Sequence, residues 1–406
     1  MSSRPPRRAG FARPASLTAA FVAVALLMSA CGSSSSSSGK DAEAAKSSAP
    51  PKPVVQITPN VANNAQNVPI DKVVSVQVAK GRIDDVKLTG AKGSQVHGAV
   101  AGGGVSWSSS DVLEPTATYT LSVDATGTDG KKETSTTTFS TQKLGLDKQT
   151  YPSIAPLNGE TVGVGMPVIV TFDVPVKDHA AFEKKMQVVS KPAQEGSWYW
   201  VSDKEVHYRP RVYWQPHSTI TVNLNINSVP AGNGIYGQKN RSITFHTGDS
   251  HIYKVNTHTD QMAVMVNGRQ VRDIPVTTGK PGFVTRSGVK IIIEKYATKD
   301  MNSETIGIGK ANQEYYDMKG VKWAMRMTFS GEFIHGAPWS VAQQGHENVS
   351  HGCTGMSDAN AGWLYSMSRR GDVVETTGTS RQMEFGNGWG DWNLSWDKYK
   401  AGSALS

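Results

Sequence analysis

The stretch SHGCTGMS, residues 350–357, and the stretch FIHGAPW, residues 333–339, contain the most concentrated chemistry in the chain. They place a histidine, His335, shortly before a cysteine, Cys353, close enough for one loop between neighbouring strands to bring the two together. A cysteine attacks as its thiolate, and an adjacent imidazole can take the thiol proton and later protonate a leaving amine. The two stretches therefore predict a cysteine nucleophile with a histidine base.

The backbone around these two residues has predicted roles as well. No acidic residue follows His335 directly, so we expect the carbonyl of Gly336 to orient the imidazole. Gly352 allows the main chain to approach a substrate closely, and the amides around Cys353 could form an oxyanion hole.

Two other interpretations apply to the same side chains. A lone exported thiol can be a buried structural cysteine, but the flanking His351 and Gly352 favour a reactive one. A zinc site would use His335, His346, His351 and Cys353, but this spacing fits no common closed site and a metal would quench the nucleophile. We expect neither a metal nor a cofactor.

The surrounding segment, residues 251–378, is predicted to be a mostly β catalytic domain. Asn267-Gly268 is a strong hairpin signal between a strand at 262–266 and one at 269–276, and further strands are expected at 253–256, 289–294 and 323–329. One helix is expected from Asp358 to Arg370, capped by Ser357 and stopped by Gly371. Residues 379–406 are rich in tryptophan and are expected to form a C-terminal extension packed back onto this domain.

Upstream, residues 54–147 and 148–250 repeat a pattern of short Val- and Thr-rich runs separated by turn residues. Strands are expected at 73–78, 119–123 and 136–139 in the first unit and at 168–172, 219–224 and 242–247 in the second. The closing runs at 138–141 and 244–247 match in position, which predicts two tandem immunoglobulin-like sandwiches. In the second, Trp198, Trp200 and Trp214 are interpreted as core or domain-interface residues, with a sugar-stacking patch as the alternative.

The N-terminus has the features of an export signal. Arginines precede an apolar run at 17–28, and the sequence Met28-Ser29-Ala30-Cys31 follows as a lipobox-like cleavage site within residues 1–31. Cys31 would carry the lipid, and the Ser- and Ala-rich residues 32–53 would form a flexible tether. A plain secretory signal with an incidental cysteine is the alternative.

Composition narrows the class of protein. A hydrophobic fraction of 38% and a charged fraction of 19% indicate folded domains rather than a disordered chain. The net charge of +8 is spread over scattered Lys and Arg residues, so we expect no nucleic-acid partner but an anionic envelope, with lipid-anchored localisation at the outer face of the cytoplasmic membrane. The sequence leaves the oligomeric state undetermined.

The pairing of His335-Gly336 with Ser350-His351-Gly352-Cys353 resembles the signature of the YkuD-type L,D-transpeptidases. The domain order, from lipobox to Trp-rich tail, is similar to that of the mycobacterial members. The resemblance implies Cys353 as the acylated nucleophile, His335 as base and acid, and His351 as a pocket residue. It also implies that the substrate lies against Tyr316, Ser330, Gly331, Trp339 and Gly355.

The chain departs from the family pattern at two of these positions. Asparagine is frequent where Gly355 stands, and serine is frequent where Gly336 stands. The second change is harmless if the carbonyl of Gly336 does the orienting, whereas the first removes a side chain from the substrate site.

The resemblance implies that the enzyme takes peptidoglycan stem peptides as donor and acceptor. It would form 3→3 cross-links through a cysteine acyl-enzyme with release of D-alanine, and carbapenems would acylate Cys353. An L,D-carboxypeptidase or D-amino-acid exchange enzyme on the same stems is the first alternative, because acylation is shared and only the acceptor differs. A non-catalytic wall-binding lipoprotein is the second.

Overall fold

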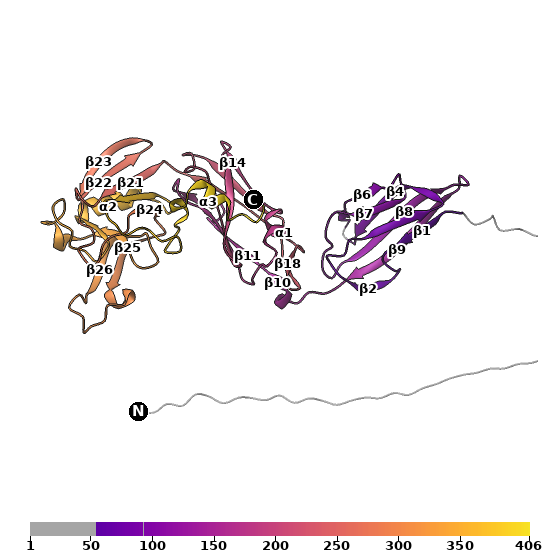
Figure 1. Cartoon of the computed structure of the whole chain (residues 1–406), viewed down its shortest axis with the longest axis horizontal. Helices are drawn as coiled ribbons and strands as arrows, with labels where there is room; N and C mark the ends of the chain where they lie inside the picture. The colour runs from indigo at the N-terminus through magenta and orange to yellow at the C-terminus, as the bar shows by residue number, and fades with distance from the viewer. Residues whose placement is uncertain (1–53, 92) are drawn as a thin grey trace, which may run out of the picture. The chain divides into compact units, whose positions relative to one another are not determined.

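The computed structural model describes residues 54–91 and 93–406, and within them the chain is mostly β (Figure 1). This confirms the predicted fold class of immunoglobulin-like sandwiches followed by a β-rich catalytic domain with few helices. The export signal with Cys31 and the tether lie outside the described residues.

The first sandwich pairs a four-stranded sheet, ordered β1-β3-β7-β6, with a five-stranded sheet, ordered β2-β9-β8-β4-β5. Alternate residues of β8 are buried, as the Val- and Thr-rich alternation predicts. The strands are β1 (Gln56–Pro59), β2 (Ala65–Val68), β3 (Ser75–Ala79), β4 (Gly81–Gly90), β5 (Gln95–Val96), β6 (Gly98–Ala101), β7 (Ser106–Ser109), β8 (Thr118–Gly127) and β9 (Lys132–Thr141).

The second sandwich has sheets ordered β11-β13-β16-β15 and β12-β20-β17-β14, with a small third sheet, β10-β19-β18. Trp198 and Trp214 are buried in its core, so the interpretation of these tryptophans as core residues is confirmed. The elements are β10 (Gln149–Thr150), β11 (Pro152–Ala155), β12 (Thr161–Val162), β13 (Val168–Phe172), α1 (His179–Glu183), β14 (Met186–Lys191), β15 (Gly196–Ser202), β16 (Glu205–Pro210), β17 (Thr219–Leu224), β18 (Pro230–Gly232), β19 (Ile235–Gly237) and β20 (Arg241–Thr247).

The catalytic domain contains a five-stranded sheet, β23-β22-β21-β29-β24, and a four-stranded sheet, β25-β26-β27-β28. Its core lies between them and includes Tyr253, Ile292, Met325, Ile334 and Leu364. The elements are β21 (His251–Asn256), β22 (Gln261–Val266), β23 (Arg269–Pro275), β24 (Gly288–Ile291), β25 (Glu294–Asn302), β26 (Asp317–Arg326), β27 (Phe333–Gly336), β28 (Thr354–Met356), α2 (Asp358–Met367), β29 (Val373–Thr377) and α3 (Trp396–Lys400).

Two predicted strands of this domain differ most from the observed ones. The strand expected at 289–294 is broken, because β24 ends at Ile291 and β25 begins at Glu294 in the other sheet. The strand expected at 323–329 begins earlier, at Asp317, and ends at Arg326, because residues 328–331 form a turn in which the Gly331 amide donates to the Thr328 carbonyl.

The helix α2 has the predicted cap but ends earlier than predicted. Ser357 accepts a hydrogen bond from the Asn360 amide. The helix stops at Met367 rather than Arg370, because Ser368 is extended and its hydroxyl donates to the Leu364 carbonyl.

The C-terminal extension contacts the catalytic domain, as predicted, and also the second sandwich. Asn393 exchanges hydrogen bonds with the backbone of Val289 in β24. The guanidinium of Arg209, in β16, lies over the rings of Trp392 and Tyr399. The extension therefore joins the core of the second sandwich as well.

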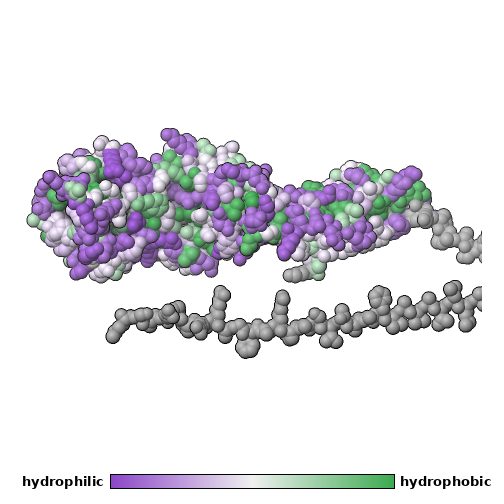
Figure 2. Space-filling view, turned by 90° about the horizontal axis from the view of Figure 1, so that it is seen from below, coloured by the Kyte–Doolittle hydropathy of each residue, from purple (hydrophilic) through white to green (hydrophobic). Residues whose placement is uncertain are grey.

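Hydrophilic side chains cover most of the face in Figure 2, and hydrophobic residues occur there in separate patches. Within the described part of the chain, none of the helices is both long and apolar enough to cross a bilayer.

Candidate active site

His335 and Cys353 lie on neighbouring parallel strands. His335 is in β27, paired with Gly355 of β28, and Cys353 immediately precedes β28. Both residues line one pocket, together with Tyr316, Trp339, Gly355 and other residues. The parallel pairing explains how a histidine upstream in sequence comes to line the same pocket as the thiol.

The imidazole of His335 is oriented by the backbone. Its Nδ1 lies 2.8 Å from the carbonyl oxygen of Gly336, the contact expected from the sequence. A carbonyl only accepts, so Nδ1 carries the proton and Nε2 keeps a lone pair. Burial lowers the pKa of His335, more than the Gly336 carbonyl and the charge of Asp358 raise it. The ring is therefore a neutral base at pH 7.

The thiol of Cys353 is also neutral at rest. Burial raises its pKa to about 12, although a hydrogen bond from the Phe333 backbone acts in the opposite direction. The sulfur lies 3.6 Å from the carbonyl oxygen of Gly331, to which the S–H donates. The site therefore holds an uncharged thiol and an uncharged imidazole, the two groups that activation of a cysteine by a general base requires.

A tight turn presents the nucleophile. Ser350 donates its hydroxyl to the Cys353 carbonyl at 2.7 Å and accepts the Gly352 amide at 3.0 Å. Gly352 has φ of 120°, a backbone conformation that side chains other than glycine rarely adopt. The Gly352 amide already donates to the Ser350 hydroxyl, so it is not free to donate to an oxyanion. Of the amides around Cys353 that were expected to form an oxyanion hole, this one is therefore excluded.

The other residues implied by the resemblance lie around two pockets that both reach Cys353. Trp339, half exposed, lines the pocket that contains His335, with the two ring centres 5.8 Å apart. Ser330 and Gly331 line the second pocket, and Tyr316 lines both. Burial raises the pKa of Tyr316 to about 12, so its hydroxyl is a neutral donor.

His351 is held by a carboxylate on the segment between β25 and β26. Its Nε2 lies 2.8 Å from Glu314, which also pairs with Lys280 at 2.6 Å. The rings of Phe283 and Tyr316 flank the imidazole, with centres 4.6 and 5.0 Å away. His351 thus lines the pocket, and Glu314 links the segment between β25 and β26 to this histidine.

Gly355 is closely packed by Ala337 and Thr277. It exchanges backbone hydrogen bonds with Thr277 at 2.8 and 2.9 Å. A Cβ there would lie 3.0 Å from the Cβ of Ala337 and 3.1 Å from the Cγ2 of Thr277. The floor of the pocket is therefore formed by backbone at this position.

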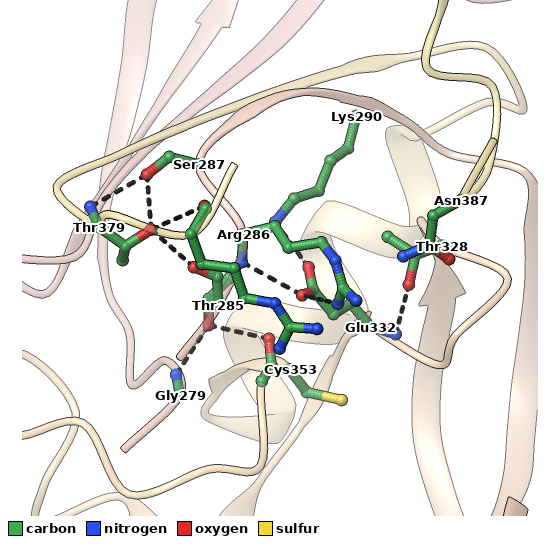
Figure 3. A network of polar contacts seen from close by, with 12 residues as sticks. Gly279, Thr285, Arg286, Ser287, Lys290, Thr328, Glu332, Cys353, Thr379 and Asn387 are labelled. Carbon is green, nitrogen blue, oxygen red and sulfur yellow. Dashed lines mark hydrogen bonds and ion pairs between the residues drawn. The ribbon is translucent and has the colours of Figure 1, made fainter. Parts of the chain in front are cut away.

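Sequence reasoning missed a group of buried charges behind the thiol. Lys290, in β24, is fully buried and pairs with Glu332, which also binds Arg286 (Figure 3). The available signal was a lysine within the apolar run VKIII at 289–293, since lysine is almost never fully buried unless it is paired. Glu314 gave no comparable signal.

The zinc interpretation finds no geometric counterpart in the described residues. His346 is exposed and does not line the pocket of His335 and Cys353. Within 54–91 and 93–406, no three or more His, Cys, Asp or Glu side chains are arranged to hold a metal ion.

A neutral thiol, an oriented imidazole and a pocket open beside the sulfur are the features of an enzyme that forms a covalent intermediate on cysteine. The protein-family comparisons then identify the kind. Residues 250–376 match the model of the L,D-transpeptidase catalytic domain, and residues 65–230 match that of a bacterial Ig domain.

Curated relatives extend the match over most of the chain. L,D-transpeptidase 2 of Mycobacterium tuberculosis is 36% identical over 86% of this chain and 85% of its own length. L,D-transpeptidase 5 of the same organism is 32% identical over 90% of this chain and 80% of its own length. A solved L,D-transpeptidase in complex with imipenem is 34% identical, with a TM-score of 0.49 over 55% of this chain and 97% of that chain. The chain belongs to the YkuD-type L,D-transpeptidase family and is an acyltransferase.

Proposed function

We propose that the enzyme forms 3→3 cross-links between peptidoglycan stems through an acyl-enzyme on Cys353. Sγ attacks the carbonyl carbon of the third residue of a donor tetrapeptide while His335 Nε2 takes the thiol proton. The bond to the terminal D-alanine breaks, and the imidazolium gives this proton to the departing amine. A side-chain amine of the acceptor then attacks the thioester, its proton passes through His335 to the sulfur, and the free thiol is restored.

The observation that carries the proposal is the orientation of His335 by Gly336, which leaves Nε2 as the basic atom beside the thiol pocket. The two pockets that share Tyr316 and Cys353 support a reaction with two peptide substrates. One pocket contains Trp339 and the other contains Ser330, so donor and acceptor can approach the sulfur from different directions.

The test is a product analysis with purified tetrapeptide stems. The wild-type enzyme should release D-alanine and form a tripeptide–tetrapeptide dimer, and Cys353→Ala should do neither. Adding a free D-amino acid as acceptor distinguishes the exchange reaction, and accumulation of tripeptide alone would indicate a carboxypeptidase. No D-alanine release and no acylated Cys353 in intact-mass spectra would refute the proposal.

Carbapenems are proposed to acylate the same sulfur. Attack on the β-lactam carbonyl opens the ring without losing a fragment, so the protein mass should rise by the mass of the drug. The support is family membership together with the open pocket beside Cys353. An unchanged mass after incubation with imipenem would contradict this.

We also propose that the enzyme is attached to the outer face of the cytoplasmic membrane by a lipid on Cys31. The support is the sequence Met28-Ser29-Ala30-Cys31 after an apolar run. Mass spectrometry of the N-terminal peptide should show an acylated Cys31, and Cys31→Ala should move the enzyme to the soluble fraction. A membrane-bound Cys31→Ala protein would exclude this anchor.

A further inference from the structure

Lys290 is a buried cation with an incomplete set of partners. Its side chain is fully buried, and Nζ lies 2.7 Å from Oε2 of Glu332. Among the described residues, neither this Nζ nor Oε2 of Glu332 has a hydrogen-bond partner, so the contact is an ion pair without hydrogen-bond geometry. A buried ion pair is weak evidence for stability, because desolvation of the two charges can exceed their attraction. A methionine of similar length would fill this position at lower cost, so the charge needs another explanation.

Glu332 connects this cation to the residues around the sulfur. Its carboxylate accepts two hydrogen bonds from Arg286, one from Nη1 at 2.9 Å and one from the backbone amide at 3.2 Å. Its neighbours in sequence are Gly331, whose carbonyl contacts Cys353 Sγ, and Phe333, whose backbone hydrogen bonds to the thiol. In Figure 3 the side chains of Lys290 and Arg286 converge on this carboxylate. The pair therefore holds the backbone on both sides of residue 332 against the nucleophile.

The same group is anchored from the C-terminal extension. Arg286 also pairs with Glu384, and Asn387 exchanges hydrogen bonds of 2.8 Å with the backbone amide and hydroxyl of Ser330. The turn that ends in Glu332 is thereby held from two sides.

The charges of the pair act on the thiol in opposite directions. The Glu332 carboxylate raises the pKa of the Cys353 thiol and so opposes formation of the thiolate, whereas the Lys290 ammonium group lowers this pKa and favours the thiolate. Other titratable groups also face the sulfur. Tyr316, His335 and His351 line the first pocket with Cys353, and Lys299, Asp300 and Arg326 line the second. Arg286 binds the Glu332 carboxylate. Without Lys290, the thiolate that forms during attack would face the Glu332 charge with less compensation.

We propose that Lys290 is a positioning residue for acyl transfer: it fixes Glu332, and so the Gly331–Phe333 backbone, behind Cys353 Sγ and offsets the carboxylate charge as the thiolate forms. The inference rests on the cysteine acyl transfer proposed above. It assigns a task to a side chain that contacts neither substrate nor sulfur.

The experiment measures alkylation of Cys353 by iodoacetamide against pH, a reaction that requires the thiolate but no peptide substrate. Lys290→Met leaves the Glu332 charge less compensated, so the alkylation curve should move to higher pH. At a fixed pH below the thiol pKa, the rate should fall by about threefold to tenfold. In the double variant Lys290→Met/Glu332→Gln both charges are removed, and the curve should return toward that of the wild type.

This rescue separates the proposal from a packing role, because a second buried substitution would add to a packing defect rather than reverse it. Asp391→Asn is the matched control: it removes a buried carboxylate that pairs with His207, and it should leave the alkylation curve unchanged. Thermal unfolding of every variant verifies that it is folded.

If the buried variants fail to fold, Glu384→Gln provides the second test. Its side chain is half exposed and pairs with the same Arg286 as Glu332 does. Removing the Glu384 charge leaves Arg286 to compensate Glu332 alone, so the alkylation curve should move slightly to lower pH. An unmoved curve in folded Lys290→Met, or in Glu384→Gln when that variant alone folds, overturns the inference. Wild-type protein that is alkylated but releases no D-alanine from stems would refute the proposed function instead.

Discussion

The carbonyl oxygen of Gly336 accepts a hydrogen bond from Nδ1 of the preceding residue, His335, at 2.8 Å. In many cysteine and serine enzymes a separate side chain orients the base. Here one residue and the next carbonyl do so, and the side chain at position 336 is not required. This explains how glycine replaces the serine frequent in relatives without removing the orienting contact.

Replacing the base tests this arrangement. His335→Asn should lower the rate of acylation by imipenem by about 10²–10⁴-fold, because the thiol of Cys353 has a raised pKa and loses the proposed base that shares its pocket. Stopped-flow or time-resolved intact-mass measurement follows the acylation. Gly336→Ala keeps the carbonyl, but its Cβ would meet Oδ1 of Asp358 and this carboxylate must move aside. If thermal unfolding shows that Gly336→Ala keeps wild-type stability, it should retain far more activity than His335→Asn, and equal losses in both would then contradict the backbone role.

The pH dependence of acylation follows from the lowered pKa of His335. The base is neutral and active above its pKa, so the rate of acylation by imipenem should fall only below the ordinary histidine value of about 6.5. The measurement is the second-order acylation rate between pH 4.5 and 8. A rate that is already halved at pH 7 would show that His335 is protonated more easily than its burial implies.

Gly355 offers a prediction about substrate selection. A side chain at this position would meet Ala337 and Thr277, so Gly355→Asn should destabilise the fold by about 1–3 kcal/mol and narrow the pocket. Thermal unfolding measures the first effect, and D-alanine release from tetrapeptide stems measures the second. Gly309→Ala is the control, because a Cβ there meets no atom within 4 Å.

The meeting of His335 and Cys353 in one pocket was predictable from sequence, because the signal for it is local. His335 and Cys353 are each embedded in a short distinctive stretch, and the predicted contact with Gly336 joins adjacent residues. Strands 168–172 and 219–224 were also predicted with the observed bounds, because alternation and flanking turn residues mark them clearly.

Features that depend on distant partners were not predictable. The ion pair of Lys290, in β24, joins it to Glu332, which lies in the turn just before β27 of the other sheet, and no local pattern indicates this contact. The helices α1 and α3 have five residues each, too few to show a helical period. The contact of the C-terminal extension with Arg209 likewise joins segments far apart in the chain, and composition alone does not indicate it.

Glu314 is expected to hold the segment between β25 and β26 closed over His351. Lys280 and His351 lower the pKa of this carboxyl, so the contact is present above the usual glutamate pKa of about 4.3 and is lost as the pH falls below it. Glu314→Gln should increase amide hydrogen exchange in residues 303–316 at pH 7. Glu304→Gln, on the same segment, is the control, and equal exchange in the two variants would exclude the contact as a closure.

The buried pair of His207 and Asp391 predicts a pH-dependent stability. Burial alone would lower the pKa of His207, but Asp391 and Glu205 outweigh it and raise the pKa to about 9. The protonated pair therefore contributes fully below the unfolded histidine pKa of about 6.5, and its contribution of about 3 kcal/mol is lost as the pH rises from there to about 9. Denaturant unfolding across this range should show the loss in the wild type, while His207→Gln should show a flatter profile. Parallel profiles for the two proteins would mean that His207 is not charged in the fold, and that the second sandwich and the C-terminal extension are joined without this ion pair.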